Sequence, residues 1–180
     1  MSSYFRLMPD YKNLDIYIKQ KNNLSRKVVT NRGVPVKESP EQPFVFLVEA
    51  DEQGVDVVIP PFSSAGPIFS VDIVNDLQKN GVDNIEVFDA VFVDSSSNQT
   101  IESNHKVVNI LGRVKCANLD NSKYESIAGS QYFHKVEIDI DEARGLKLFR
   151  LQEMPTTIVI HESLKEIFSE RIDRFVLETA

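Results

Sequence analysis

Short runs of alternating apolar and polar residues recur along this chain of 180 residues, and they come in groups. Such runs, when rich in β-branched and aromatic residues, predict half-buried strands. We expect strands at 4–8, 14–18, 44–50, 55–59, 85–94, 105–116, 133–141, 146–151, 156–160 and 173–179. Helices are predicted at 71–80 and 162–171. Because strands and helices do not alternate regularly, the sequence predicts an α+β fold. It would have a mostly antiparallel sheet with two or three helices packed on it, and long N-terminal loops.

Local signals mark both ends of the helix predicted at 71–80. Ser70 stands where a capping residue is needed, and Asp72 suits the first turn. Gly81 follows the last periodic residue and can adopt the positive φ that often ends a helix. The residues expected on the buried face are Val71, Val74 and Leu77.

Two further expectations concern the N-terminal half. Pro9 directly follows the run at 4–8, which favours a strand at the edge of a sheet. The runs at 44–50 and 55–59 flank the sequence DEQG, in which Gly54 can take a positive φ. This arrangement predicts a β-hairpin.

The polar stretch at 95–104, SSSNQTIESN, is the strongest boundary signal in the chain. It divides a variable N-terminal lobe, residues 1–94, from a C-terminal α+β lobe, residues 104–180. An alternative is that the two halves form one compact domain, since 180 residues suffice for either arrangement.

Charge and composition narrow the classes of function. The net charge of −7 has the wrong sign for a protein that grips phosphate backbones, so we expect no nucleic-acid partner. The apolar runs are too short to span a bilayer, and no secretory signal precedes the first strand, so no membrane partner is expected. A single cysteine agrees with a reducing cytoplasm, where we expect the protein to act.

The lone thiol, Cys116, follows His105 within the predicted strand at 105–116. Side chains alternate between the two faces of a strand, so these two residues would point to opposite faces. Cys116 ends a stripe of apolar residues, which favours a small buried side chain over a nucleophile. The chain therefore offers no sequence evidence for a catalytic cysteine–histidine pair.

The sharpest charge feature is the segment VEIDIDEAR, residues 136–144. In a strand, Glu137, Asp139 and Asp141 would share one face, with Glu142 beside them. This row is open to three interpretations: a solvated sheet face, a surface that meets a basic protein, or ligands for Ca²⁺ or Mg²⁺. The glycine and distal glutamate of an EF-hand loop do not follow, so no cofactor is expected.

Two stretches resemble a family of bacterial immunity proteins from polymorphic toxin systems, formerly a domain of unknown function. The first, residues 105–125, resembles the family's strand of the form aromatic–x–V–x–N–x–L and the acidic turn after it. The second, residues 145–170, resembles its strand Gly–x–x–Leu–Phe–Arg–Leu and the following strand and helix. The matching residues are Val107, Asn109, Leu111, Leu119, Asp120, Ser122, Tyr124, Gly145, Leu148, Phe149, Arg150, Leu151, Ile158, Val159, Leu164, Lys165 and Phe175. His105 departs from the pattern, because an aromatic residue is expected there.

The resemblance covers the C-terminal part of the chain and implies a non-enzymatic protein that binds a cognate toxin and occludes it. Under this interpretation the acidic row of Glu137, Asp139, Asp141 and Glu142 is the predicted interface for the toxin. The alternative function is a small metal-binding or hydrolytic domain that uses the same acidic strand face.

Overall fold

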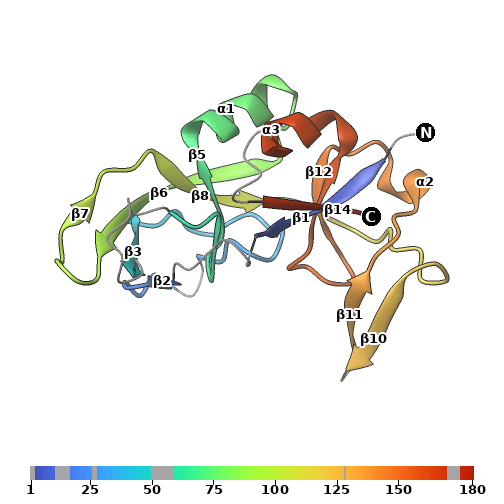
Figure 1. Cartoon of the computed structure of the whole chain (residues 1–180), viewed down its shortest axis with the longest axis horizontal. Coiled ribbons are helices and arrows are strands. Elements are labelled where there is room, and N and C mark those ends of the chain that lie inside the picture. Colours follow the sequence, from blue (N-terminus) through green and yellow to red (C-terminus); the bar gives the residue numbers. More distant parts are fainter. Residues whose placement is uncertain (1–2, 11–16, 26–27, 50–58, 128, 170–174) are drawn as a thin grey trace.

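A computed structural model of the protein describes residues 3–10, 17–25, 28–49, 59–127, 129–169 and 175–180 (Figure 1). The predicted hairpin at 44–59 includes residues 50–58, and the predicted strand at 14–18 includes residues 14–16. These parts lie outside the described residues.

One sheet joins the two ends of the chain. Its five strands are, in spatial order, β14 (Phe175–Thr179), β1 (Tyr4–Pro9), β13 (Ile158–His161), β12 (Leu148–Leu151) and β9 (Arg113–Val114). β1 pairs antiparallel with β13 on one side and with β14 on the other. The prediction that β1 lies at an edge is therefore wrong. Pro9 sits at the last position of the strand, where its missing N–H interrupts no ladder.

The larger sheet is built from the middle of the chain. Its order is β2 (Tyr17–Gln20), β3 (Phe44–Glu49), β6 (Ile85–Asp94), β8 (His105–Ile110), β5 (Gly66–Ser70) and β4 (Phe62–Ser63), and β7 (Thr100–Ile101) also pairs with β6. The Cα atoms of its two edge strands, β2 and β4, approach within 8 Å. The sheet therefore curls until its edges nearly meet.

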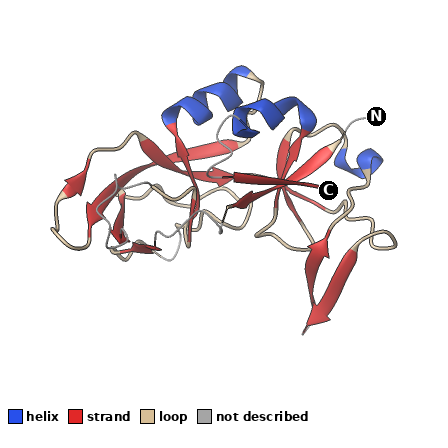
Figure 2. Ribbon diagram, viewed as in Figure 1, coloured by secondary structure: helices blue, strands red, loops and turns tan. Residues whose placement is uncertain are grey.

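Both longer helices lie on the same side of the sheets, as Figure 2 shows. In α1 (Val71–Lys79), the Ser70 hydroxyl accepts a hydrogen bond from the Ile73 N–H at 3.3 Å, and Gly81 has a φ of 79°. The predicted cap and helix end are confirmed. The residues of α1 that are buried are Ile73, Val74 and Leu77, so Ile73 takes the place predicted for Val71.

A short 3₁₀ turn, Glu162–Leu164, leads into α3 (Lys165–Ser169), and α3 packs against α1. The ring of His161 caps this turn by accepting a hydrogen bond from the Ser163 N–H. The main hydrophobic core lies beneath the two helices and includes Phe69, Leu77, Leu148 and Phe168.

The segment predicted to separate two lobes lies within the larger sheet. β7 folds back on β6, and β8 then pairs with β6 so that Val108 lies opposite Val87. The main core also combines residues from both predicted lobes, such as Leu77 and Leu148. The two halves therefore share a sheet and a core.

The α+β prediction is confirmed at the level of class, and the fold is rich in β-structure. Among the described strands, β3 pairs with β6 and β12 pairs with β9 in parallel, so the sheets are mixed and not purely antiparallel. None of the helices in the described ranges is long and apolar enough to cross a membrane.

A separate two-stranded sheet, β10 (Lys123–Ile127) and β11 (Ser130–Lys135), projects from the body (Figure 1), and the short helix α2 (Ile140–Ala143) follows it in the chain. The strand predicted at 133–141 is thus wrong in its extent, because β11 ends at Lys135 and α2 begins five residues later.

Candidate functional site

The four acidic residues predicted as an interface do not share a strand face. Glu137 lies on an irregular segment, where its carboxylate accepts a hydrogen bond from the Asn121 side chain at 2.9 Å. Asp139 caps α2, and its Oδ1 accepts bonds from the N–H groups of Asp141 and Glu142 at 3.1 and 3.2 Å. Asp141 and Glu142 lie in the first turn of α2, where a helix dipole favours negative charge. The carboxylate row of a single strand is therefore a wrong prediction, although Asp139, Asp141 and Glu142 are all exposed.

The apolar residues of the same segment explain this outcome. Val136 and Ile138 are buried in a second core cluster with Cys116 and Phe133. The Asp139 N–H bonds to the Cys116 carbonyl at 2.8 Å, which pins the chain to the body before it turns into α2. The alternation of apolar and polar residues therefore holds for Val136 and Ile138, and it ends at Asp139, whose carboxylate caps α2.

The metal-binding alternative has no geometric basis in the described ranges. Within them, no group of three or more histidine, cysteine, aspartate and glutamate side chains is arranged to hold a metal ion. The Oδ1 atom of Asp139 already accepts a hydrogen bond in the helix cap, and the Glu137 carboxylate accepts one from Asn121.

Cys116 is buried, as predicted, with 2% of its surface exposed. Burial raises the pKa of its thiol to about 12, and the nearby carboxylates of Glu153, Asp139 and Glu142 add to the effect. At neutral pH the thiol keeps its proton, so it lacks the thiolate character of a catalytic cysteine.

The three histidines have other structural roles. The single strand predicted at 105–116 is interrupted after Ile110, which places His105 in the larger sheet and β9, next to Cys116, in the smaller one. His105 bonds to the Ser103 hydroxyl at 2.8 Å, and His134 bonds to Glu125 at 3.0 Å. His161 caps the turn before α3.

The projecting hairpin presents a distinct exposed surface. Facing residues of β10 and β11 share a side, and their pairing puts Tyr124 with Phe133 and Glu125 with Tyr132. Phe133 is buried in the second core cluster, so its side of the hairpin faces the body. The other side carries Glu125, Ile127, Tyr132 and His134, which we term the outer hairpin face. Ile127 is 53% exposed and Tyr132 is 51% exposed.

A hydrogen bond from β1 attaches the hairpin to the body. The Arg6 guanidinium donates to the Phe133 carbonyl at 3.3 Å and to the Glu178 carboxylate at 3.0 Å. Tyr124 contacts the Phe133 ring, with the ring centroids 5.6 Å apart. All five residues of β10 are exposed. The hairpin therefore holds an apolar and aromatic surface away from the core.

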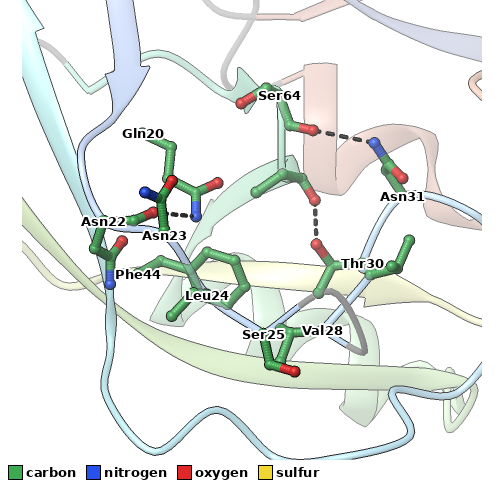
Figure 3. A pocket seen from close by; sticks show the side chains of 12 residues that line it. Gln20, Asn22, Asn23, Leu24, Ser25, Val28, Thr30, Asn31, Phe44 and Ser64 are labelled. Atoms are coloured by element: carbon green, nitrogen blue, oxygen red, sulfur yellow. Dashed lines mark hydrogen bonds between the residues drawn. The ribbon is translucent and has the colours of Figure 1, made fainter.

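A pocket of about 430 Å³ opens at the seam between the edges of the larger sheet (Figure 3). It is lined by Gln20, Asn22, Asn23, Leu24, Ser25, Val28, Val29, Thr30, Asn31, Phe44, Ser64 and Ala65. Amide side chains dominate its polar wall, and Leu24, Val28 and Phe44 supply apolar contacts.

Arg150 supports this region from the core. It is only 2% exposed, and its guanidinium donates to the carbonyls of Pro155 and Thr30 at 3.0 and 3.5 Å. Burial lowers the pKa of Arg150 to about 10. This arginine, part of the motif LFRL, thus links β12 to the loop that lines the pocket.

Sequence reasoning missed both the outer hairpin face and the pocket. β10 is exposed on both sides, so it lacks the apolar alternation that marks a strand. The pocket joins residues 22–25 and 28–31 to Phe44 and Ser64, which no local motif connects. The density of asparagine and glutamine at 20–31 was the available signal.

Comparison with known proteins adds no family. A scan of the chain against protein-family models gives no match, and a search of curated proteins finds no significant relative.

Proposed function

We propose that this protein is a bacterial immunity protein that acts in the cytoplasm, where it binds a cognate toxin and occludes it without catalysing a reaction. The observation that carries the proposal is the outer hairpin face. The resemblance of residues 105–125 and 145–170 to immunity proteins supplies the class of partner.

The composition of the outer hairpin face supports a protein partner. Tyrosine is enriched at the centres of protein interfaces, where it offers a large apolar ring and a polar tip. Tyr132 and Ile127 are held clear of the core, so a partner can bury them without unfolding anything. A projecting hairpin can also reach into a concave surface such as the active site of a toxin.

Charge supports a basic partner. The chain has a net charge of −7, and Asp139, Asp141 and Glu142 are exposed on or next to α2. Residues 136–139 alone separate α2 from the end of β11, so these carboxylates lie close along the chain to the hairpin. Opposite charges steer association and raise its rate more than they raise affinity.

The experiment takes the product of the neighbouring open reading frame as the candidate toxin. The two proteins are co-expressed, growth is scored, and binding of the purified pair is followed by biolayer interferometry. The double substitution Ile127→Ala and Tyr132→Ala is expected to weaken binding at least 30-fold, about 2 kcal/mol, and to abolish rescue of growth.

Charge reversal tests the acidic residues separately. Asp141→Lys and Glu142→Lys together are expected to slow association about tenfold at low salt, and added salt should reduce the difference from wild type. Asp139 is left intact because it caps α2. Reversal of Asp83 and Glu102, two exposed acids elsewhere, is the matched control. Full rescue and wild-type binding by the hairpin double variant would refute this interface.

A further inference from the structure

The two strands of the projecting hairpin each have an edge that the other strand does not cover (Figure 1). Among the described strands, β10 and β11 pair only with each other. At an uncovered edge, every second residue directs its backbone N–H and C=O away from the ladder. The body already uses part of the β11 edge, because the Arg6 guanidinium donates to the Phe133 carbonyl at 3.3 Å. The two edges of the hairpin therefore differ in their contact with the body.

The bond from Arg6 also indicates which residues of β10 direct their backbone outward. Facing residues of an antiparallel pair alternate between those that bond to each other through the backbone and those that do not. The Phe133 carbonyl points away from β10 toward Arg6, so Phe133 and its facing residue Tyr124 are of the second kind. The pairing is regular from Tyr124 to the end of β10, so Ser126, two positions on, is of the same kind. The backbone groups of Tyr124 and Ser126 therefore point to the open edge, whereas those of Glu125 point to β11.

These outward backbone groups have no partner in the part of the chain that the structure describes. No described strand other than β11 pairs with β10, and no described side chain or loop bonds to the backbone of Tyr124 or Ser126. All five residues of β10 are exposed. An exposed edge of this kind is a template for one more strand, in which main-chain bonds provide affinity and side chains provide selectivity.

A second copy of the chain is a poor occupant of this edge. Antiparallel pairing of two β10 strands through their outward groups places Tyr124 of one copy opposite Ser126 of the other. Glu125 then lies opposite Glu125, in the type of pair that brings side chains closest, and like charges there are unfavourable. Each copy also carries a net charge of −7. The edge therefore disfavours its own sequence and favours a basic strand.

Glu125 is placed to meet a cation on an added strand. Its carboxylate is 63% exposed, and within the described residues it contacts His134 of β11 at 3.0 Å through Oε1 alone. A lysine or arginine directly opposite Glu125 would approach this carboxylate from the other side. Ile127, on the same face of the hairpin and 53% exposed, would meet the next side chain on that face of the added strand.

We infer that the toxin donates an extended segment that pairs antiparallel with β10, bonding to the backbone of Tyr124 and Ser126 and placing a lysine or arginine opposite Glu125. This inference rests on the proposed function and adds to it the mode of binding and the chemistry of the bound segment. The added strand extends the outer hairpin face, so both the backbone edge and the exposed side chains contribute to one interface.

The test places a proline on either edge of the hairpin. Proline lacks the N–H and is tolerated in a strand where that group faces away from the ladder. Ser126→Pro removes an outward N–H from β10, and Gln131→Pro removes one from β11 at the facing position. The side chain of Ser126 lies on the same side of the hairpin as Phe133, so Ser126→Pro leaves the outer hairpin face unchanged.

Biolayer interferometry measures binding of each variant to the product of the neighbouring open reading frame, the candidate toxin. Ser126→Pro is expected to weaken binding about tenfold or more, because it removes a main-chain bond and blocks the edge. Gln131→Pro and Ser126→Ala should bind like wild type. Glu125→Lys should weaken binding about tenfold, whereas Glu102→Lys, the same charge change at an exposed site outside the hairpin, should not. The ¹⁵N spectrum of each variant reports whether the hairpin is folded.

Hydrogen exchange followed by NMR gives a second readout on the unmodified protein. In the free protein, the amides of Tyr124 and Ser126 should exchange faster than that of Glu125, which bonds within the hairpin. Binding of the candidate toxin should protect both of the outward amides. A partner that contacts only the side chains of the outer hairpin face would leave these two amides exchanging as before.

The outcomes separate this inference from the proposed function. If the candidate toxin binds wild type, and neither Ser126→Pro nor hydrogen exchange shows an effect, strand addition is overturned and toxin binding stands. Equal losses in Ser126→Pro and Gln131→Pro also overturn it, because binding would then depend on the hairpin as a whole. Dimerisation of the free protein that Ser126→Pro abolishes would show that the edge accepts a second copy, contrary to the inference. Absence of binding by wild type removes both proposals.

Discussion

The strands β12 and β10 belong to antiparallel pairs of similar size, yet their surroundings are opposite. All four residues of β12 are buried, and all five residues of β10 are exposed. β12 lies between β13 and β9 and is covered on both faces, whereas β10 pairs with β11 alone among the described strands. The pair β12–β13 contributes to the stability of the core, whereas the pair β10–β11 exposes side chains that a partner can contact.

The largest expected effect comes from matched truncations on the two sides of this comparison. Phe149→Ala in β12 should lower the free energy of unfolding by about 3–5 kcal/mol, because its fully buried ring packs against Tyr4. Tyr132→Ala in β11 should change it by less than about 0.5 kcal/mol. Urea unfolding measures both. Equal losses would show that the hairpin is packed as tightly as the core.

The buried Cys116 thiol makes the free energy of unfolding depend on pH. Its pKa of about 12 means that the folded protein keeps a proton that the unfolded chain releases near pH 9. The resulting stability is complete below about pH 9 and falls by roughly 1.4 kcal/mol per pH unit as the pH rises toward 12. Urea unfolding should show a loss of roughly 1.4 kcal/mol in total between about pH 8 and pH 10, and Cys116→Ala should remove it. Equal slopes for the two proteins would contradict the raised pKa.

The cap of helix α1 provides the next test. Ser70→Ala should cost about 1 kcal/mol, because the hydroxyl satisfies the Ile73 N–H of a helix packed on the main core. Ser70→Thr keeps the hydroxyl and serves as the control. Thermal unfolding monitored by circular dichroism checks the difference, and an unchanged melting temperature in Ser70→Ala would show that the cap is not needed.

The smallest effects are expected from two ion pairs. Glu178→Gln should lower the free energy of unfolding by up to about 1 kcal/mol, because its partner Arg6 is only 12% exposed. Glu125→Gln removes the pair with His134, in which both side chains are more than 60% exposed, and should leave the unfolding midpoint unchanged. A larger loss from Glu125→Gln would mean that the outer hairpin face is ordered by this pair.

The parts of the fold that could be predicted are those with local causes. Ser70, Asp72 and Gly81 marked the ends of α1 because capping depends on neighbouring residues. β12 and β13 were visible because their apolar side chains are buried in a sheet. The central position of β1 was not visible, since it depends on strands that lie at the other end of the chain.

The candidate surfaces were harder to predict for a related reason. The alternation at 136–141 predicted a strand, yet a carboxylate at Asp139 serves a helix cap as readily as a strand face. The amides of Asn22 and Asn31 bond to backbone groups that are distant in the sequence, so their role appears only once the sheet is assembled. A hydrophobic pattern in the sequence indicates burial, whereas the strand β10 of the hairpin consists of exposed residues.

The position of β1 between β13 and β14 has a consequence during synthesis. Residues 4–9 leave the ribosome well before their earliest pairing partner, which lies roughly 150 residues later in the chain. At ordinary elongation speeds β1 waits on the order of ten seconds with Tyr4 and Leu7 unshielded. The smaller sheet therefore closes only after residues 158–179 have been synthesised, and a nascent chain of this protein is a natural client for chaperones that hold apolar segments.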